Sequence, residues 1–189
     1  MNPHFLFNSL NSIAATIDDS PQVAEKMVVK LSDLYRRILI AAKKDSHSLE
    51  EEISICTDYI NIEKIRFENR LIPKIQTGNN LDLKTIQIPV LLIQTLIENS
   101  IKHGIAPKIK GGEVLLSITR VGTQLEILVK DQGINHDSDL KKNETSGLRE
   151  SFKHCKQRLA LIYPDRFAFN ADIGQNGSEI CIHIDLEVP

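Results

Sequence analysis

His4 is a residue near the start of the chain whose type and position could support chemistry. A helix over residues 4–17 places His4, Asn8 and Asn11 on one face. The opposite face carries an apolar stripe formed by Leu6, Leu10, Ile13 and Ile17. Because a neutral imidazole nitrogen is nucleophilic near neutral pH, a histidine that points away from the packed face can accept a phosphoryl group. An isolated histidine is more often an ordinary surface side chain, so the residues around His4 must decide whether it is a phosphoacceptor.

A second polar group lies on a helix predicted over residues 89–103 and closed by Gly104. Asn99 stands three and four residues before Lys102 and His103, so the three side chains can converge on one ligand. An amide oxygen suits Mg²⁺, and the two basic side chains can donate hydrogen bonds to phosphates. The alternative is a solvated polar helix face.

Asp131 and Gly133 form a third candidate at the end of a predicted strand. A carboxylate there can accept a hydrogen bond from the exocyclic amine of adenine, and glycine lets the backbone approach the base. Most Asp-x-Gly sequences are plain turns, so this signal is weak by itself.

The three stretches together resemble a known family. Residues 2–8, with the sequence NPHFLFN, resemble the phosphoacceptor box of the LytS-like sensor histidine kinases at every position. The resemblance continues through LYR at 34–36, LEEE at 49–52 and YINIEKIRF at 59–67. Residues 89–104 resemble the N-box of the GHKL ATPase and kinase superfamily, and residues 129–133 its adenine-binding box. The match covers nearly the whole chain.

This resemblance implies a sensor histidine kinase of a two-component system. His4 would take the γ-phosphoryl group of ATP and pass it to a response-regulator protein. Glu98 would assist the chemistry or cap the polar face. Asn99 would hold Mg²⁺. The residues that the resemblance implies for nucleotide binding are Asn99, Lys102, His103, Asp131, Gly133 and Arg158.

The chain departs from the family in its glycine-rich boxes. Gln132 and Asn135 replace an Asn and a Gly after the strand. In the second box, Gly147 comes four residues too early, and non-glycine residues occupy the Gly, Leu and Asn positions: Ser151, Phe152 and His154. Glycine there normally lets backbone N–H groups wrap phosphates, so its loss would weaken ATP binding or stop turnover.

The elements that must position these residues follow from hydrophobic periodicity and turn signals. Helices are predicted over 21–44 and 48–70, the latter from the capping-box spacing of Ser48 and Glu51. A hairpin is predicted over 113–119 and 124–130, a mobile loop over 132–147, a helix over 151–162, and strands over 167–173 and 179–186. The expected fold class is α+β: a helical phosphoacceptor and dimerisation region at 1–72, then a GHKL-type α/β sandwich at 73–189, a mixed sheet with helices on one face.

Composition narrows the function classes. With 23 basic and 25 acidic side chains the net charge is -2, and Trp is absent, so nucleic acid is not an expected partner. No apolar run in the sequence reaches the roughly 18 to 20 residues that span a bilayer, and a basic-then-apolar leader is not expected. We expect a cytoplasmic protein, the cytosolic part of an inner-membrane sensor.

Its cysteines (Cys56, Cys155 and Cys181) are expected to be small buried thiols in a reducing compartment. Continuous apolar helix faces predict a homodimer.

Two other interpretations stay open. A degenerate, non-catalytic module would act through dimerisation or partner binding, as the altered second box suggests. An ATP-hydrolysing GHKL machine fits less well, because Thr95 stands where such enzymes place a water-activating Glu. A metal enzyme is not expected, because none of the six histidines has ligand spacing with a cysteine or another histidine.

Overall fold

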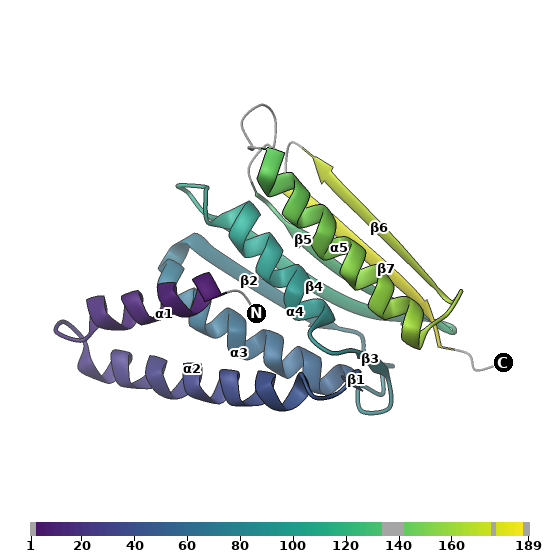
Figure 1. Cartoon of the computed structure of the whole chain (residues 1–189), viewed down its shortest axis with the longest axis horizontal. Helices are drawn as coiled ribbons and strands as arrows, with labels where there is room; N and C mark the ends of the chain where they lie inside the picture. Colours follow the sequence, from purple (N-terminus) through teal and green to yellow (C-terminus); the bar gives the residue numbers. More distant parts are fainter. Residues whose placement is uncertain (1–2, 134–141, 175–176, 187–189) are drawn as a thin grey trace.

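The chain folds into a helical region followed by a sheet with helices against it, the predicted α+β class (Figure 1). The computed structural model describes residues 3–133, 142–174 and 177–186. The helical region contains α1 (Pro3–Thr16), α2 (Pro21–Ala41) and α3 (Leu49–Phe67), and a short 3-10 turn, η1 (Glu68–Arg70), ends it. None of the helices among these described residues combines the length and apolar character required to cross a membrane.

The ends of α3 show the residues that are typical of helix termini. At α3, the Ser48 side chain accepts from the Glu51 N–H and the Glu51 carboxylate accepts from the Ser48 N–H, so the predicted capping box is present. Glu50, Glu51 and Glu52 fill its first turn, and Lys64 and Arg66 its last, which complements the helix dipole.

The apolar stripe predicted for α1 was wrong in part. Ile13 is buried, but Leu10 and Ile17 are 47% and 53% exposed. The helix buries Phe5 instead, because the Phe5 ring packs on Tyr59 of α3 with ring centroids 4.8 Å apart. In α2 the buried residues are Ala24, Met27, Leu31, Leu34, Ile38 and Ala41.

The main sheet is mixed, with strand order β2-β4-β5-β7-β6. β2 (Leu71–Thr77) runs parallel to β4 (Gly112–Val121), and every other neighbouring pair is antiparallel. The predicted hairpin is β4 with β5 (Gln124–Asp131), and the last two predicted strands are β6 (Phe167–Gly174) and β7 (Gly177–Asp185). One face is lined by buried residues such as Leu116, Ile127 and Ile182. The helices α4 (Leu92–Asn99) and α5 (Lys142–Ile162) lie over this face (Figure 1).

Two of the predicted boundaries were wrong. Pro89 does not open a helix: it ends β3 (Gln87–Pro89), which pairs with β1 (Ser46–Ser48), and α4 (Leu92–Asn99) starts after it. The loop expected over 132–147 ends earlier, because α5 (Lys142–Ile162) is already helical at Lys142. The remaining part of that loop, 134–141, lies outside the described residues.

After Asn99 the helix continues as a π-helical segment, η2 (Ser100–Ile105). The Ala106 N–H donates to the Ile101 carbonyl, a bond that spans five residues rather than four. Such widened turns occur frequently at functional sites.

Candidate functional site

Asp131, at the end of β5, is a buried carboxylate held by hydrogen bonds. It is 3% exposed. The Gly133 N–H donates to Oδ1 at 2.9 Å, the Ser178 N–H donates to the same oxygen at 3.3 Å, and the Ser178 hydroxyl donates to Oδ2. These donors satisfy a charge that would otherwise be costly to bury and fix its direction.

Three glycines make room for this carboxylate. A Cβ at Gly104 would lie 2.4 Å from Asp131 Oδ1, and one at Gly133 would lie 2.5 Å from the Gly104 Cα. Gly177, with φ of 125°, would place a Cβ 1.9 Å from the Asp131 carbonyl oxygen. The close approach of η2, the start of β7 and the segment just after β5 therefore requires glycine at all three positions.

A small pocket of about 10 Å³ opens beside Asp131. We call it the Asp131 pocket. Its polar wall comes from α4 and η2, with Asn99 and His103, while α5, β6 and β7 supply an apolar wall. Asn99 Nδ2 donates to Ser151 Oγ of α5 at 2.9 Å, across the pocket. The residues that line it are Asn99, Ser100, His103, Gly104, Asp131, Leu148, Phe152, Ile173, Ser178 and Ile180.

The chemistry of this lining fits an adenine nucleotide. A buried carboxylate is a hydrogen-bond acceptor for an amine on a flat base, and the side chains of Leu148, Phe152 and Ile180 can contact its faces. Asn99 and His103 lie on the polar side of the same pocket, where the oxygen of Asn99 could bind Mg²⁺ and His103 could donate to phosphate.

A second pocket lies on another side of the same helix, and it contains His4. We call it the acceptor pocket. His4 is exposed, and its Nδ1 lies 3.0 Å from Asn8 Nδ2. Glu98 and Lys102 also line this pocket. They come from α4 and η2, which together form one continuous helix that we call the N-box helix. The residues that line it are His4, Phe5, Asn8, Tyr59, Glu63, Arg66, Glu98, Ile101, Lys102 and Ala106.

Two glutamates, Glu63 and Glu98, line the acceptor pocket. Glu63 is buried, accepts hydrogen bonds from Tyr59 and Arg66, and lies 2.5 Å from Arg66 Nη2. Burial raises the pKa of the Glu63 carboxyl, although the charge of Arg66 opposes the rise. Glu98 accepts from Gln94 Nε2 at 3.0 Å, and its negative charge contributes to the raised pKa of both Tyr59 and Glu63.

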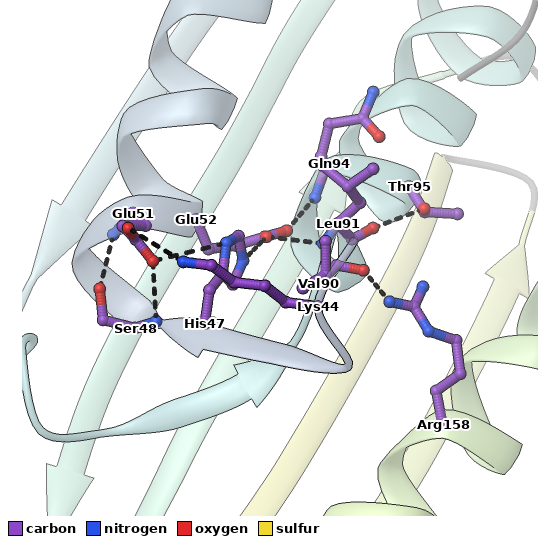
Figure 2. A network of polar contacts seen from close by, with 10 residues as sticks. All are labelled: Lys44, His47, Ser48, Glu51, Glu52, Val90, Leu91, Gln94, Thr95 and Arg158. Carbon is purple, nitrogen blue, oxygen red and sulfur yellow. Dashed lines mark hydrogen bonds and ion pairs between the residues drawn. The ribbon is translucent and has the colours of Figure 1, made fainter. Parts of the chain in front are cut away.

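The start of α4 is held by a residue from the helical region (Figure 2). Leu91 has a left-handed backbone, with φ of 59°, and α4 has no side-chain cap of its own from this position. Glu52 of α3, which is fully buried, accepts from the Leu91 and Gln94 N–H groups, both at 2.9 Å, and from His47 Nε2. A carboxylate at a helix N-terminus satisfies unpaired N–H groups and complements the dipole.

The structure brings some of the predicted site residues together and separates others. Asn99, His103 and Asp131 line one pocket, and Gly133 packs beside them. Lys102 does not join them: it lines the acceptor pocket. The π-helical turn explains this, because a wider turn keeps position i+4 above Asn99 and moves position i+3 round the axis.

Arg158 is not brought to the Asp131 pocket. Its guanidinium donates to the Val90 carbonyl just before α4, and the Tyr163 hydroxyl donates to the Gln87 carbonyl (Figure 2 shows Arg158). Arg158 and Tyr163 therefore fasten α5 to the segment that precedes α4.

Sequence reasoning missed Glu52, His47 and Ser178. A glutamate in the first turn of a helix is usually solvent-exposed, so nothing in the sequence marked Glu52 as buried. The hydroxyl bond from Ser178 to Asp131 depends on a β5–β7 pairing that local sequence does not reveal. Asn135 lies outside the described residues.

The altered second glycine box is helical, which leads to a prediction for Gly147. The residue lies inside α5, is exposed, and a Cβ there would meet nothing within 4 Å. We expect Gly147→Ala to stabilise the protein by up to about 1 kcal/mol, because alanine is the better helix former. Nucleotide affinity should stay unchanged. Urea unfolding and a nucleotide titration check this, and a loss of affinity would show that Gly147 serves the site.

Comparisons with known proteins agree with this arrangement. A family model described as histidine kinase matches residues 1–71. The sensor histidine kinase YpdA of Escherichia coli is 34% identical over 168 residues, which are 86% of this chain and 29% of that protein. The sensor histidine kinase/phosphatase LytS of Staphylococcus aureus is 31% identical over 154 residues, 80% of this chain and 26% of that one. The chain thus spans about a third or less of the curated relatives it matches.

Solved structures show the same fold at low sequence identity. The histidine kinase domain of the Erythrobacter litoralis EL346 blue-light activated histidine kinase superposes with a TM-score of 0.53 at 15% identity, covering 98% of this chain and 96% of that one. A bacterial phosphotransferase superposes with a TM-score of 0.54 at 10% identity, covering 95% and 88%. With the relatives above and the motif at residues 2–8, these findings agree on one assignment: the chain belongs to the LytS-like family of sensor histidine kinases.

Proposed function

We propose that this chain is the catalytic core of a two-component sensor. It binds ATP and Mg²⁺, phosphorylates His4, and passes the phosphoryl group to an aspartate of a response-regulator protein. The observation that carries the proposal is the placement of the two pockets. The N-box helix presents Asn99 and His103 to the Asp131 pocket, and Glu98 and Lys102 to the pocket that contains His4.

In this reaction the lone pair of one His4 ring nitrogen attacks the γ-phosphorus of ATP. The new N–P bond forms as the bond to the oxygen that bridges the β- and γ-phosphorus breaks, and ADP leaves with that electron pair. Phosphohistidine then releases one proton. We assign the attack to Nε2, because Asn8 contacts the other ring nitrogen, Nδ1. A lone pair on Nε2 requires the ring proton to be on Nδ1, so the Asn8 amide must present its oxygen, and not its NH₂ group, to that N–H.

The side chains have separate roles. Asp131 would accept from the adenine amine, and Asn99 would hold Mg²⁺. His103 and Lys102 would neutralise phosphate charge, Lys102 from the side on which His4 lies. Glu98, which lines the acceptor pocket together with His4, would take the proton. Positioning and charge neutralisation account for most catalysis in phosphoryl transfer, so this small set suffices.

The helical region would form a homodimer. Phe7 and Leu10 of α1 are 64% and 47% exposed, and Ile17, just after α1, is 53% exposed. Three residues of α2 are also more than half exposed: Val29, Leu39 and Ile40. A second copy of the region would cover these side chains. The core would act in the cytoplasm, next to its response regulator.

The test is acid-labile labelling from γ-labelled ATP with Mg²⁺. We expect label on the wild-type chain and none on His4→Gln, because the acceptor nitrogen is gone. Asn99→Ala should also lose the label, by at least the factor of about 100 that removal of a group stabilising transferred charge costs. Asn11→Ala, an exposed change on α1, is the control and should keep full labelling.

A second candidate is a non-catalytic module that acts by dimerisation or partner binding. The altered second glycine box favours it. Where the family has a glycine-rich turn, α5 is a continuous helix through residues 147–154, and the Ser151 hydroxyl of this helix accepts a hydrogen bond from the Asn99 side-chain amide. A fluorescent adenine nucleotide separates the candidates. Binding without label indicates an uncoupled kinase core, and no binding at millimolar nucleotide would establish the non-catalytic module.

A further inference from the structure

Three metal-binding side chains meet on the face of the sheet opposite α4 and α5. Glu126 lies on β5, and Cys181 and His183 lie on β7. Glu126 and His183 are direct cross-strand partners, and Cys181 is two residues before His183, so it points to the same face. Each of the three is partly buried. None belongs to the Asp131 pocket or the acceptor pocket.

The distances between their ligand atoms suit a single small cation. His183 Nε2 lies 3.0 Å from Glu126 Oε2 and 3.6 Å from Cys181 Sγ, and all three ligand atoms lie within 4.8 Å of one another. Tetrahedral zinc, from its usual bond lengths, separates its N and O ligands by about 3.3 Å and its S and N ligands by about 3.6 Å. The side chains therefore need only small rotations to share one ion.

The electrostatic surroundings favour a cation over a bare thiol. Burial raises the pKa of the Cys181 thiol, and the negative charges of Glu126 and Glu179 raise it further. Glu179 lies on the same face and pairs with Lys130 at 2.6 Å. The carboxylates of Glu126 and Glu179, the latter paired with Lys130, thus place negative charge near the sulfur, where a divalent ion would bind.

We propose that Glu126, Cys181 and His183 bind one Zn²⁺ ion, with water as the fourth ligand. A thiolate, an imidazole and a carboxylate form a borderline-soft donor set, which suits zinc rather than Mg²⁺ or Ca²⁺. The ion joins β5 to β7. Sequence spacing alone did not single out this site, because one ligand comes from a strand more than fifty residues away, a separation evident from the numbering.

Cobalt(II) titration of the untagged full chain tests the proposal. Co²⁺ replaces Zn²⁺ in such sites, and a sulfur ligand produces a charge-transfer absorption. We expect saturation at one Co²⁺ per chain with that absorption, its reversal by Zn²⁺, and no reversal by Mg²⁺. Cys181→Ser should abolish the absorption. His183→Gln should weaken affinity by at least the roughly 10- to 100-fold that loss of an outer-shell partner alone costs.

His154→Gln is the matched control. His154 also lies near a carboxylate, with its Nε2 3.9 Å from Glu150 Oε1, but it is exposed on α5 beside no accessible sulfur. Its removal should change neither stoichiometry nor absorption. Absence of saturable binding, or an unchanged spectrum in Cys181→Ser, would overturn the proposal.

Alkylation of the wild-type chain gives an answer that does not depend on variant folding. Cys56 and Cys155 are buried, and burial raises the pKa of Cys155 to about 11, so Cys181 should be the fastest thiol to react. Saturating Zn²⁺ should slow alkylation of Cys181 at least tenfold and Mg²⁺ should not, as peptide mass spectrometry would show. Equal rates with and without zinc would also overturn the proposal.

Discussion

Replacing Glu52 with alanine is expected to destabilise the chain by about 3 to 5 kcal/mol, because several buried donors lose their acceptor at once. The carboxylate accepts from the Leu91 and Gln94 N–H groups and from the His47 ring, and none of its surface is exposed (Figure 2). Each buried donor left without a partner costs about 1 to 3 kcal/mol. Since domains are stable by only about 5 to 15 kcal/mol, the loss is a large fraction of the total.

Urea unfolding followed by circular dichroism measures the effect. Glu52→Gln should fall between wild type and Glu52→Ala, because one amide oxygen remains for two backbone donors. Glu50→Gln is the matched control: it lies in the same helical turn, is exposed, and should stay within about 0.5 kcal/mol of wild type. A loss below 1 kcal/mol in Glu52→Ala would mean that the Glu52 contacts contribute little to stability.

Replacing Glu52 should also alter the functional site, because Glu52 supports the backbone at the start of the helix that carries Asn99. Leu91 adopts a left-handed conformation that costs a non-glycine residue about 1 to 2 kcal/mol, and the Glu52 bond to its N–H supports this backbone. Arg158 supports the neighbouring carbonyl from α5. The start of the N-box helix is thus tied to the helical region on one side and to α5 on the other, so Glu52 links the acceptor helices to the position of Asn99.

How far the sequence could predict the molecule depended on the range of the contacts involved. The capping box at Ser48 and Glu51 and the β4–β5 hairpin were predicted because both are local patterns. The buried face of α1 was predicted poorly, because the packing of Phe5 on Tyr59 sets its rotation, and that contact joins residues 54 positions apart by their numbering. Helical periodicity cannot register such a partner.

In the candidate site, too, local motifs could be predicted from the sequence and long-range contacts could not. Residues in short motifs, such as Asn99 and Asp131, were found from the sequence, and the structure places them in one pocket. Lys102 was grouped with Asn99 on the assumption of a regular α-helix, which the π-helical turn breaks. Arg158 was assigned by its place in a motif, whereas its contact with Val90 depends on how α5 crosses β3 and α4.

Replacing Asp131 with asparagine is expected to weaken ATP binding by about ten- to a hundredfold, the cost of about 1.5 to 3 kcal/mol for losing a hydrogen bond to a charged group. The fold should survive. An asparagine oxygen can still accept from the Gly133 and Ser178 N–H groups, and its amide can donate to the Ser178 hydroxyl, so all three native contacts have substitutes.

The change should also reduce the discrimination between bases. A carboxylate accepts from the 6-amino group of adenine and repels the 6-oxo group of guanine, whereas an amide can accept from one or donate to the other. We therefore expect the ratio of GTP to ATP dissociation constants to fall by at least tenfold in Asp131→Asn. Competition against a fluorescent adenine nucleotide measures both constants on the same sample.

Asp172→Asn is the control for this comparison. Asp172 is an exposed carboxylate on β6, so its neutralisation changes the net charge equally without touching the pocket. Its affinities for both nucleotides should match wild type. If Asp131→Asn also left the GTP to ATP ratio unchanged, Asp131 could not be the group that reads the base. Its buried hydrogen bonds to Gly133 and Ser178 would then serve only to join β5 to β7.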